Sequence, residues 1–340
     1  MGLPSNKVTQ FRQWHTELLA RHAASARPEI ERLLAETRNS LADLIDSRHN
    51  NVALVPNFSL GFNMILDGLD RGHKVLLLQG DYPSVNWPVE QRKFETCYAT
   101  IDQHIEDNII QAMEQERPSV FCFSIVQYIS GIKLSKKFIT QLKADYEDVL
   151  FIADGTQYIG TEFFSQRNTG IDIIGASCYK WLVAGYGNGF FSFRSSDSGS
   201  LASRLLDMPS LGFNSKQELH DDNPVSLVAH LEPGHLDSTN LASILHGIKT
   251  LQACGLTDAY DHIEKLKAQA KKRFAPLLSQ DVNHRDHHST IFNIKGDQAL
   301  FDKLTKQNIQ VSQRGDGIRF GVHVYNTMDD LDVLARACGL

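Results

Sequence analysis

Two ionisable residues stand in apolar stretches of the chain, one strand and one loop apart. Asp154 follows the apolar run 149–153, and Lys180 lies within the segment Cys-Tyr-Lys-Trp-Leu at 178–182. A lysine amine can carry pyridoxal phosphate as a Schiff base, and a carboxylate can keep the ring nitrogen protonated so that the ring acts as an electron sink. The pair therefore indicates pyridoxal phosphate chemistry, with Lys180 and Asp154 as the catalytic residues.

Each member of the pair also has a plain structural interpretation. An Asp followed by Gly at a strand end is typical of a turn, and a lysine can lay its aliphatic stem on apolar neighbours while its amine reaches water. Gln157 favours the catalytic interpretation, because its amide could donate to the phenolic oxygen of the cofactor. Burial among apolar side chains would also lower the pKa of Lys180 and make its amine a better nucleophile.

Phosphate binding is expected at the start of a helix. Ser59 is a candidate N-cap for a helix over 60–69, and the free backbone N–H groups behind it, beginning with that of Leu60, would form an anion site. The hydroxyls of Ser177 and Tyr179 could reach the same phosphate. Without a phosphate, the Ser59 segment is simply a capped helix.

Further candidates come from two aromatic residues and an arginine. Tyr82 and Trp87 follow the apolar run 75–78, and either ring could stack on a planar cofactor or belong to the core. Arg319 lies on an expected strand shortly before the last helix, where a guanidinium can bind a substrate carboxylate through two hydrogen bonds. A structural salt bridge is the alternative for this arginine.

The elements that must position these residues are short, continuously apolar runs that alternate with amphipathic helices. Such runs are typical of a mainly parallel sheet covered by helices on both faces, which predicts an α/β fold. Ligands of these folds bind outside the carboxyl ends of the strands, where both Asp154 and Lys180 would lie. The helices include 105–116 and 136–145, the second capped by Ser135. The strand-like runs are 52–55, 75–78, 119–125, 149–153, 171–176 and 190–193.

The pattern changes near residue 244 to that of a small α+β lobe. We therefore expect a large cofactor-binding domain over 14–243 and a small domain formed by 244–340 with residues 1–13. The polar segment 207–232 is expected to be a surface loop that could cover the site. The elements expected in the small domain are helices 241–254, 258–278 and 298–307, strands 290–294, 309–312 and 317–322, and a helix over 327–338 with a capping box from Thr327 to Asp330.

Composition narrows the functional classes. The formal net charge of −6 argues against nucleic-acid and anionic-membrane partners. No apolar run approaches the ~20 residues needed to span a bilayer. The five cysteines are scattered without a CxxC pair, which predicts reduced thiols in a cytoplasmic protein. The spacing of His284, His287 and His288 could serve a metal, but no cysteine or acidic partner set lies nearby in the sequence. A solvated loop is therefore favoured for them, and no metal site is predicted.

Taken together, these segments resemble the class V aminotransferase family of fold-type I pyridoxal phosphate enzymes, which includes cysteine desulfurases, kynureninases and isopenicillin N epimerase-like proteins. The resemblance runs over nearly the whole chain. It implies a large domain with a mainly parallel, seven-stranded type of sheet and a small C-terminal α+β domain. The segments that carry it are Ala-Asp-Gly-Thr-Gln at 153–157, Ser-Cys-Tyr-Lys-Trp at 177–181, Ser-Ile-Val-Gln-Tyr at 124–128 ahead of Gly131, and Arg319 with His-Val-Tyr-Asn-Thr at 323–327.

The resemblance implies a role for each candidate residue. Lys180 would hold the cofactor covalently, Asp154 would contact its ring nitrogen and Gln157 its phenolic oxygen. Other residues would bind the phosphate, stack on the ring or face the substrate. Those for the phosphate are Ser59, Leu60, Ser177 and Tyr179, those for stacking are Tyr82 or Trp87, and those for the substrate are Arg319, Tyr128 and Gln127.

The family is usually dimeric, which implies a homodimer whose phosphate site is completed across the interface. The segment 232–240 resembles the part that reaches the neighbouring subunit. His235 stands where many relatives have Thr, so Thr239 is a second candidate for this contact.

Two departures from the family bear on the chemistry. The chain begins close to the matched region, so the N-terminal border of the substrate pocket would be open or rebuilt. The stretch before Arg319 lacks the mobile cysteine that desulfurases need, and Cys178 and Cys338 are badly placed to replace it. Sulfur transfer is therefore a less favoured candidate reaction than amino-group transfer.

We therefore expect a cytoplasmic, homodimeric aminotransferase that acts on an α-amino acid. Among enzymes, the alternatives are a β-lyase or desulfurase and an amino-acid epimerase that use the same cofactor. Outside enzymes, the alternative is a catalytically silent pyridoxal phosphate-binding protein. The side chain of the substrate does not follow from the sequence.

Overall fold

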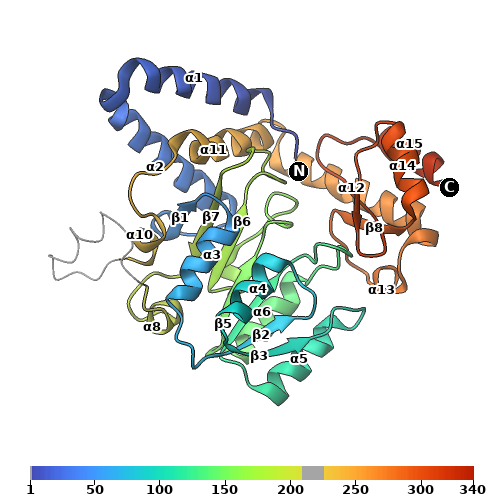
Figure 1. Cartoon of the computed structure of the whole chain (residues 1–340), viewed down its shortest axis with the longest axis horizontal. Helices are drawn as coiled ribbons and strands as arrows, with labels where there is room; N and C mark the ends of the chain where they lie inside the picture. Colours follow the sequence, from blue (N-terminus) through green and yellow to red (C-terminus); the bar gives the residue numbers. More distant parts are fainter. Residues whose placement is uncertain (1, 209–225) are drawn as a thin grey trace.

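A computed structural model describes residues 2–208 and 226–340 of the chain. The strands of its large lobe are β1 (Val52–Val55), β2 (Lys74–Leu78), β3 (Glu95–Ala99), β4 (Val120–Ser124), β5 (Leu150–Asp154), β6 (Ile173–Ser177) and β7 (Gly189–Phe193). They form one seven-stranded sheet in the order β1-β7-β6-β5-β4-β2-β3 (Figure 1). Strand β7 runs antiparallel to its neighbours β1 and β6, and the other pairs are parallel. The α/β fold class and the mainly parallel sheet are therefore confirmed.

Both faces of this sheet are buried, which explains why its strands are continuously apolar. Successive residues of a strand point to opposite faces, so Phe151 and Ala153 of β5 enter one core, while Leu150 and Ile152 enter the other. The first core is closed by α2 (Arg27–Leu44), α5 (Ile105–Glu116), α6 (Lys136–Asp145) and α11 (Ser238–Ala253), and the second by α3 (Phe58–Asp67), α4 (Pro83–Gln91), α8 (Leu201–Leu205) and α10 (Leu227–Leu231). Helices α5 and α6 have the predicted bounds, and Ser135 caps α6 as expected.

Strand β3 was not predicted. It lies at the edge of the sheet beside β2, and its residues alternate between exposed and buried positions. An edge strand with one wet face does not need a continuous apolar run, so the pattern used for the other strands passes it over. The short helix α7 (Gln166–Thr169), between β5 and β6, was also not predicted.

The N-terminal segment packs mainly on the large lobe. Helix α1 (Asn6–His22) lies along α11, and Arg12 donates to the carbonyls of Ala184 and Tyr186 and to the hydroxyl of Ser243. Residues near the start also touch the small lobe, because the N–H of Leu3 donates to the hydroxyl of Tyr325. The predicted boundary at residue 244 falls inside α11.

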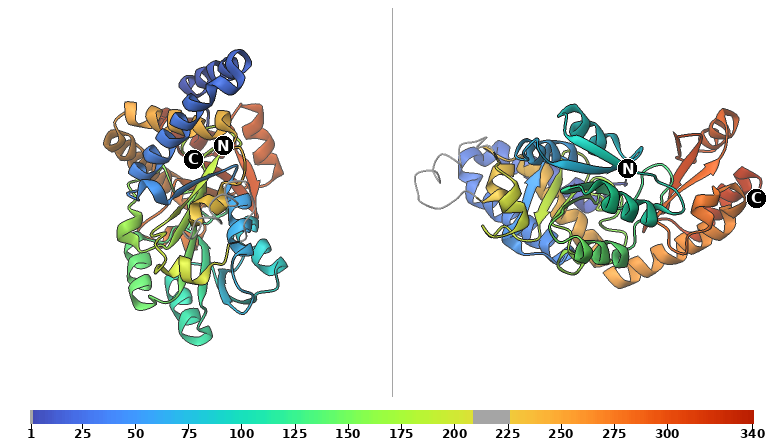
Figure 2. Two further views of the ribbon diagram at one scale, coloured as in Figure 1. Left: turned by 90° about the vertical axis from the view of Figure 1, so that its left-hand side faces the viewer. Right: turned by 90° about the horizontal axis from the view of Figure 1, so that it is seen from below.

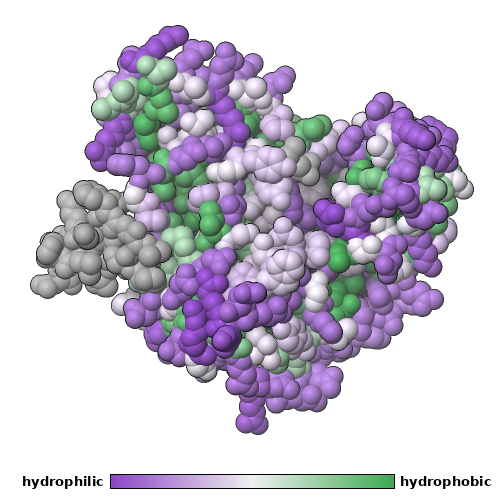
Figure 3. Space-filling view, in the orientation of Figure 1, coloured by the Kyte–Doolittle hydropathy of each residue, from purple (hydrophilic) through white to green (hydrophobic). Residues whose placement is uncertain are grey.

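The C-terminal part forms a second lobe beside the large one (Figure 2). The molecular surface is hollowed between the two lobes (Figure 3). It contains α12 (Leu256–Phe274), α13 (Gln280–Asn283), β8 (Ile291–Lys295), α14 (Gln298–Lys306), β9 (Ser312–Arg314), β10 (Gly317–Gly321) and α15 (Met328–Cys338). The three strands form an antiparallel sheet in the order β8-β10-β9. The capping box of Thr327 and Asp330 is confirmed.

Two predictions about irregular segments need correction. The strand expected at 309–312 is displaced, because β9 begins at residue 312 beside the tight turn that leads into β10. The segment 207–232 is not one continuous loop, since α10 occupies part of it, capped by Ser226; residues 209–225 lie outside the described residues. Among the described residues, no helix is long and apolar enough to cross a membrane.

Candidate active site

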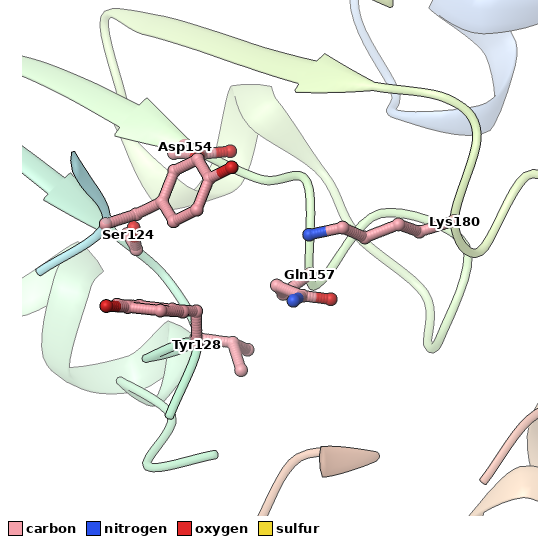
Figure 4. A pocket seen from close by; sticks show the side chains of 7 residues that line it. Ser124, Tyr128, Asp154, Gln157 and Lys180 are labelled. Carbon is pink, nitrogen blue, oxygen red and sulfur yellow. The ribbon is translucent and has the colours of Figure 1, made fainter. Parts of the chain in front are cut away.

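A small pocket opens at the carboxyl edge of the large sheet, and both the Lys180 amine and the Asp154 carboxylate line it (Figure 4). Asp154 is the last residue of β5, and Ser124, its neighbour in register, ends β4. Lys180 follows β6 after a short turn and reaches the pocket from the opposite side. The residues that line the pocket are Tyr82, Ser124, Val126, Tyr128, Asp154, Gln157 and Lys180. The expectation that Asp154 and Lys180 share one crevice is confirmed.

The electrostatics of the pocket suit a nucleophilic amine. Burial lowers the pKa of Lys180 to about 8; the Asp154 carboxylate opposes this shift, and Arg319 and Arg314 add to it. Among the described residues, no hydrogen-bond partner is found for the Lys180 amine. Burial raises the pKa of Asp154, while hydrogen bonds from Thr156 and the charge of Lys180 act in the opposite direction. Lys180 is therefore not a surface lysine that extends into water.

Asp154 and Gln157 are held by contacts of their own. The Asp154 carboxylate, 6% exposed, accepts the Thr156 N–H at 2.8 Å. The side-chain oxygen of Gln157 accepts the indole N–H of Trp181 at 3.3 Å. This bond orients the Gln157 amide so that its NH₂ group is free to donate into the pocket, as the predicted contact with a phenolic oxygen requires.

The expected phosphate site differs from the prediction in its details. Helix α3 begins at Phe58, and its cap is Asn57, whose side chain accepts the Leu60 N–H at 2.9 Å. Ser59 is therefore not the N-cap, and the Leu60 N–H is already occupied. The Ser59 hydroxyl donates to Ser84 at 2.8 Å. Ser177 fits the prediction in position, since its hydroxyl accepts the Phe58 N–H at 2.9 Å.

One donor at this helix start is uncommitted. Among the described residues, no hydrogen bond is found for the Ser59 N–H. This group lies in the first turn of α3, at the positive end of the helix dipole. Tyr179, predicted for the same phosphate, lies beside Tyr186 with ring centres 5.0 Å apart, and burial raises its pKa to about 12. Its hydroxyl therefore stays protonated and can donate.

The two candidates for stacking are separated by the structure. Tyr82 precedes α4 and lines the pocket, with its ring centre 5.8 Å from the Lys180 amine and 5.2 Å from the ring centre of Tyr128. Trp87 lies inside α4, is 62% exposed, and is not among the lining residues. Tyr82 is therefore the ring placed to cover a cofactor.

Of the three residues predicted to face the substrate, two remain candidates and one does not. Arg319 on β10 donates to the Tyr128 carbonyl at 2.5 Å, and no ion pair with a described carboxylate involves it, so the salt-bridge alternative finds no support. Tyr128 lines the pocket. The Gln127 side chain instead accepts the N–H groups of Ile129 and Ser130 and donates to the Gly80 carbonyl. Its amide stabilises a turn, and the structure does not bring it to the pocket.

The residues expected to reach a partner subunit lie away from this pocket. His235 is exposed, in the segment before α11. The Thr239 hydroxyl hydrogen-bonds with His15 Nδ1 at 3.0 Å in the same chain. Their contribution to a partner's phosphate site stays a prediction.

Four residues of the site were missed: Ser124 and Val126 line the pocket, and Asp81 and His323 support residues near it. Asp81, three residues after the end of β2 and 4% exposed, accepts the N–H groups of Ser124 and Tyr82, both at 2.7 Å, and so holds two lining residues in place. Burial raises the pKa of Asp81 to about 6. Asp154 was found because it directly follows an apolar run; Asp81 stands three residues behind the run 75–78, so a search extended to the loop after each run would have found it.

The other supporting residue that was missed is His323. Its ring stacks between Trp181 and Tyr325, with ring centres 5.1 and 4.3 Å away, and burial lowers its pKa to about 4. The neutral imidazole thus belongs to a stack that supports Trp181 next to Lys180. The signal was its place in the matched segment 323–327.

The described part of the chain contains further histidines, among them His284, His287 and His288. In the described part of the chain, no group of three or more His, Cys, Asp or Glu residues is arranged to hold a metal ion. The prediction of a solvated loop is wrong for His288, which is buried and hydrogen-bonds with the Ile291 carbonyl.

The donor set of the pocket fits pyridoxal phosphate. An uncommitted amine faces a buried carboxylate, the Gln157 amide has a free NH₂ group, and a tyrosine ring lies close to the amine. At the phosphate end, the Ser59 N–H and the Tyr179 hydroxyl are available donors. Lys180 would carry the cofactor, Asp154 would face its ring nitrogen and Gln157 its phenolic oxygen.

Comparisons with known proteins identify the family of the chain. The model of the class V aminotransferase family matches residues 5–334. An uncharacterized protein of Schizosaccharomyces pombe is 22% identical over 316 residues, which cover 87% of this chain and 72% of that protein.

Solved structures show the same fold at low sequence identity. A lysine mutant of C-DES with glycine covalently linked to its PLP cofactor superimposes with a TM-score of 0.84 at 16% identity, covering 98% of this chain and 93% of that one. The cystine C-S lyase C-DES with its product cysteine persulfide gives 0.83 at 16%, covering 98% and 94%. An apo cysteine desulfurase from Thermococcus onnurineus gives 0.81 at 15%, covering 100% and 93%. With the family match and the pocket described above, the chain belongs to the class V aminotransferase family and is a pyridoxal phosphate-dependent enzyme.

Proposed function

We propose that this enzyme transfers the amino group of an α-amino acid. The observation that carries the proposal is the Lys180 amine, which is uncommitted among the described residues, shares the pocket with Asp154, and has its pKa lowered to about 8 under the influence of burial, Asp154 and Arg319. Pyridoxal phosphate bound there supplies an electron sink for the negative charge that develops at the substrate Cα. An amine with a pKa near neutrality can both take up and return a proton at that carbon.

The remaining residues bind and orient. Arg319 holds the substrate carboxylate, because its guanidinium lacks a carboxylate partner among the described residues and lies within electrostatic range of Lys180. Asp154 keeps a cationic ring nitrogen charged, since an opposite charge in a buried site favours both ionised forms. Tyr82 covers the ring, and Asp81 fixes Tyr82 through the backbone.

A lyase is the second candidate, and the solved structures favour it. C-DES, described as a cystine C-S lyase, has the same fold. A desulfurase mechanism that uses a thiolate of this chain finds less support, because Cys178 and Cys122 are buried and burial raises the pKa of both thiols. A lyase that needs no cysteine of its own remains compatible with the pocket.

The products distinguish these reactions. The cofactor-loaded enzyme is incubated with a panel of amino acids, with and without keto-acid acceptors, while the visible spectrum is followed. Amino-group transfer yields a keto acid and the pyridoxamine form, lyase chemistry yields pyruvate or alanine, and epimerisation changes the handedness alone. A spectrum that responds to no amino acid would point to a catalytically silent binding protein. Lys180→Ala must abolish turnover, and an unchanged rate would end the proposal.

We extend the proposal to a cytoplasmic homodimer whose partner segment completes the phosphate site. The support is the family match and the five free cysteines, three of which are buried. Light scattering of the loaded enzyme measures the mass, and mixing His235→Ala or Thr239→Ala subunits with Lys180→Ala subunits shows whether the contact crosses the interface. Cofactor affinity that is unaffected by both substitutions would remove this part of the proposal.

A further inference from the structure

We infer that the substrate carries a second carboxylate on its side chain, and that Arg314 binds it. This inference rests on the proposed function, because it concerns the same pocket and an amino-acid substrate. Arg314, which does not line the pocket, would then determine which amino acids the enzyme accepts.

The register of the small sheet places two arginines on one face. Arg314 of β9 lies opposite Gly317 of β10, and Arg319 is two residues beyond Gly317. Residues that are two apart on a strand point the same way, so Arg314 and Arg319 share a face as diagonal neighbours, roughly 7–8 Å apart at the backbone. Asn293 of β8, opposite Arg319, is on this face too, and its side chain donates to the Arg314 carbonyl at 2.9 Å.

This face is turned toward the active site. The other face carries Ile318 and Phe320, which are buried in the core of the small lobe. On the arginine face, Gly321 approaches the Trp181 ring, since a Cβ at this glycine would lie 3.5 Å from it. The turn that connects the arginines is also close, because a Cβ at Gly315 would lie 3.1 Å from the Ile129 side chain, next to Tyr128.

The charge on this side of the pocket is unbalanced. Arg314 is exposed, and its recorded hydrogen bond is to the Gln313 carbonyl at 2.8 Å. Among the described residues, neither Arg314 nor Arg319 has a carboxylate within ion-pair distance, and this includes Asp316 in the turn between them. Several arginines elsewhere in both lobes do have one: Arg38 pairs with Glu232, Arg92 with Asp67, Arg273 with Asp332 and Arg285 with Glu106.

Three cations thus lie within electrostatic range of one another beside the pocket. Arg314 lowers the pKa of both Lys180 and Arg319, although burial is the larger cause in each case, so the three charges interact. The α-carboxylate of a substrate neutralises Arg319. A side-chain carboxylate would neutralise Arg314, and a guanidinium binds a carboxylate through two charge-assisted hydrogen bonds that an amide cannot match.

The test compares acids with their amides on the cofactor-loaded enzyme. The change of the visible band is titrated with L-aspartate, L-asparagine, L-glutamate, L-glutamine and L-alanine at fixed ionic strength, which gives a Kd for each without reliance on turnover. We expect at least one acid to bind about tenfold tighter than its amide. In Arg314→Gln this ratio should fall to about one. In the control Arg336→Gln, which removes the same charge from the exposed side of α15, the ratio should stay as in the wild type.

Each other outcome is decisive. Equal affinity for acid and amide in the wild type overturns the inference and leaves the proposed function intact. If Arg314→Gln weakens acids, amides and alanine by the same factor, Arg314 helps to bind the α-carboxylate, and the inference is wrong. A loss of the ratio in Arg336→Gln would show a long-range charge effect and also overturn it. If no amino acid changes the spectrum, the proposed function and the inference fail together.

Discussion

The two sides of the pocket are built differently. The large-lobe side consists of residues at the ends of fully buried strands and in the loops that follow them, and Asp154, Gln157 and Asp81 are each fixed by hydrogen bonds to neighbouring groups. The small-lobe side consists of Arg319 and Arg314 on a three-stranded sheet, with one recorded bond from Arg319 to the Tyr128 carbonyl across the gap. The difference suggests that the first side sets which chemistry occurs and the second sets which substrate is used.

The strongest test of this division is a change on the large-lobe side. Asp154→Asn should lower kcat by on the order of 10²–10³-fold for every amino acid, as for the loss of one preorganised electrostatic group. The physical reason is that a neutral amide cannot keep the cofactor's ring nitrogen charged. Steady-state kinetics over the substrate panel measures the effect, with the exposed Asp148→Asn as the matched control. A loss confined to some substrates would contradict the division.

A change on the small-lobe side should act on binding instead. Arg319→Gln should weaken all amino acids by roughly 10- to 100-fold in Kd, since hydrogen bonds to a charged group contribute about 1.5–3 kcal/mol. Arg319→Lys should recover part of this loss, because it restores the charge without the paired geometry. Spectral titration gives Kd, and single-turnover rates at saturating substrate give the chemical step. A large fall of the saturated rate with unchanged Kd would place Arg319 with the catalytic groups.

The pKa of Lys180 depends on residues from both sides of the pocket, so the pH dependence of cofactor loading tests both. The neutral Lys180 amine attacks the cofactor aldehyde, so the loading rate of the cofactor-free protein should rise with pH, with an apparent pKa of about 8. Burial remains the main cause in every variant. Arg319→Gln and Arg314→Gln remove cations that repel the protonated amine, so both should raise this pKa. Asp154→Asn removes the carboxylate that favours the protonated amine, so it should lower it. Stopped-flow absorbance from pH 6 to 10 measures the profile, and shifts in the opposite directions would refute this account.

How much of this could be predicted from the sequence differs between the two sides. Asp154 and Lys180 were found because a polar residue at the end of an apolar run stands out, and the carboxyl ends of parallel strands lie together. Arg319 was found from its place before the last helix. Arg314 was not, because its relation to Arg319 depends on a turn and a register that no composition signal marks.

The errors have physical reasons of the same kind. Asn57 and Ser59 are both good cap residues, and the backbone conformation decides between them. Tyr82 and Trp87 differ by their place relative to the start of α4, which an uncertainty of a few residues in a helix boundary obscures. The Gln127 side chain hydrogen-bonds with the backbone of a turn, and the sequence does not show the path of that backbone. Sequence patterns thus identified the strand ends well, and the side chains that serve caps and turns poorly.

The smallest predicted effect is on stability, and it is measured by removing one helix cap from each lobe. Asn57→Ala at α3 and Thr327→Ala at α15 each remove a side-chain acceptor for a backbone N–H, so each should lower the free energy of unfolding by about 1 kcal/mol. Their effects on the cofactor should differ, because α3 begins at the expected phosphate site and α15 lies in the small lobe. Urea unfolding of the cofactor-free variants measures the first effect, and equilibrium dialysis of pyridoxal phosphate the second. Asn57→Ala alone should weaken the cofactor, and an equal weakening by Thr327→Ala would mean that the small lobe takes part in holding it, against the division of roles proposed above.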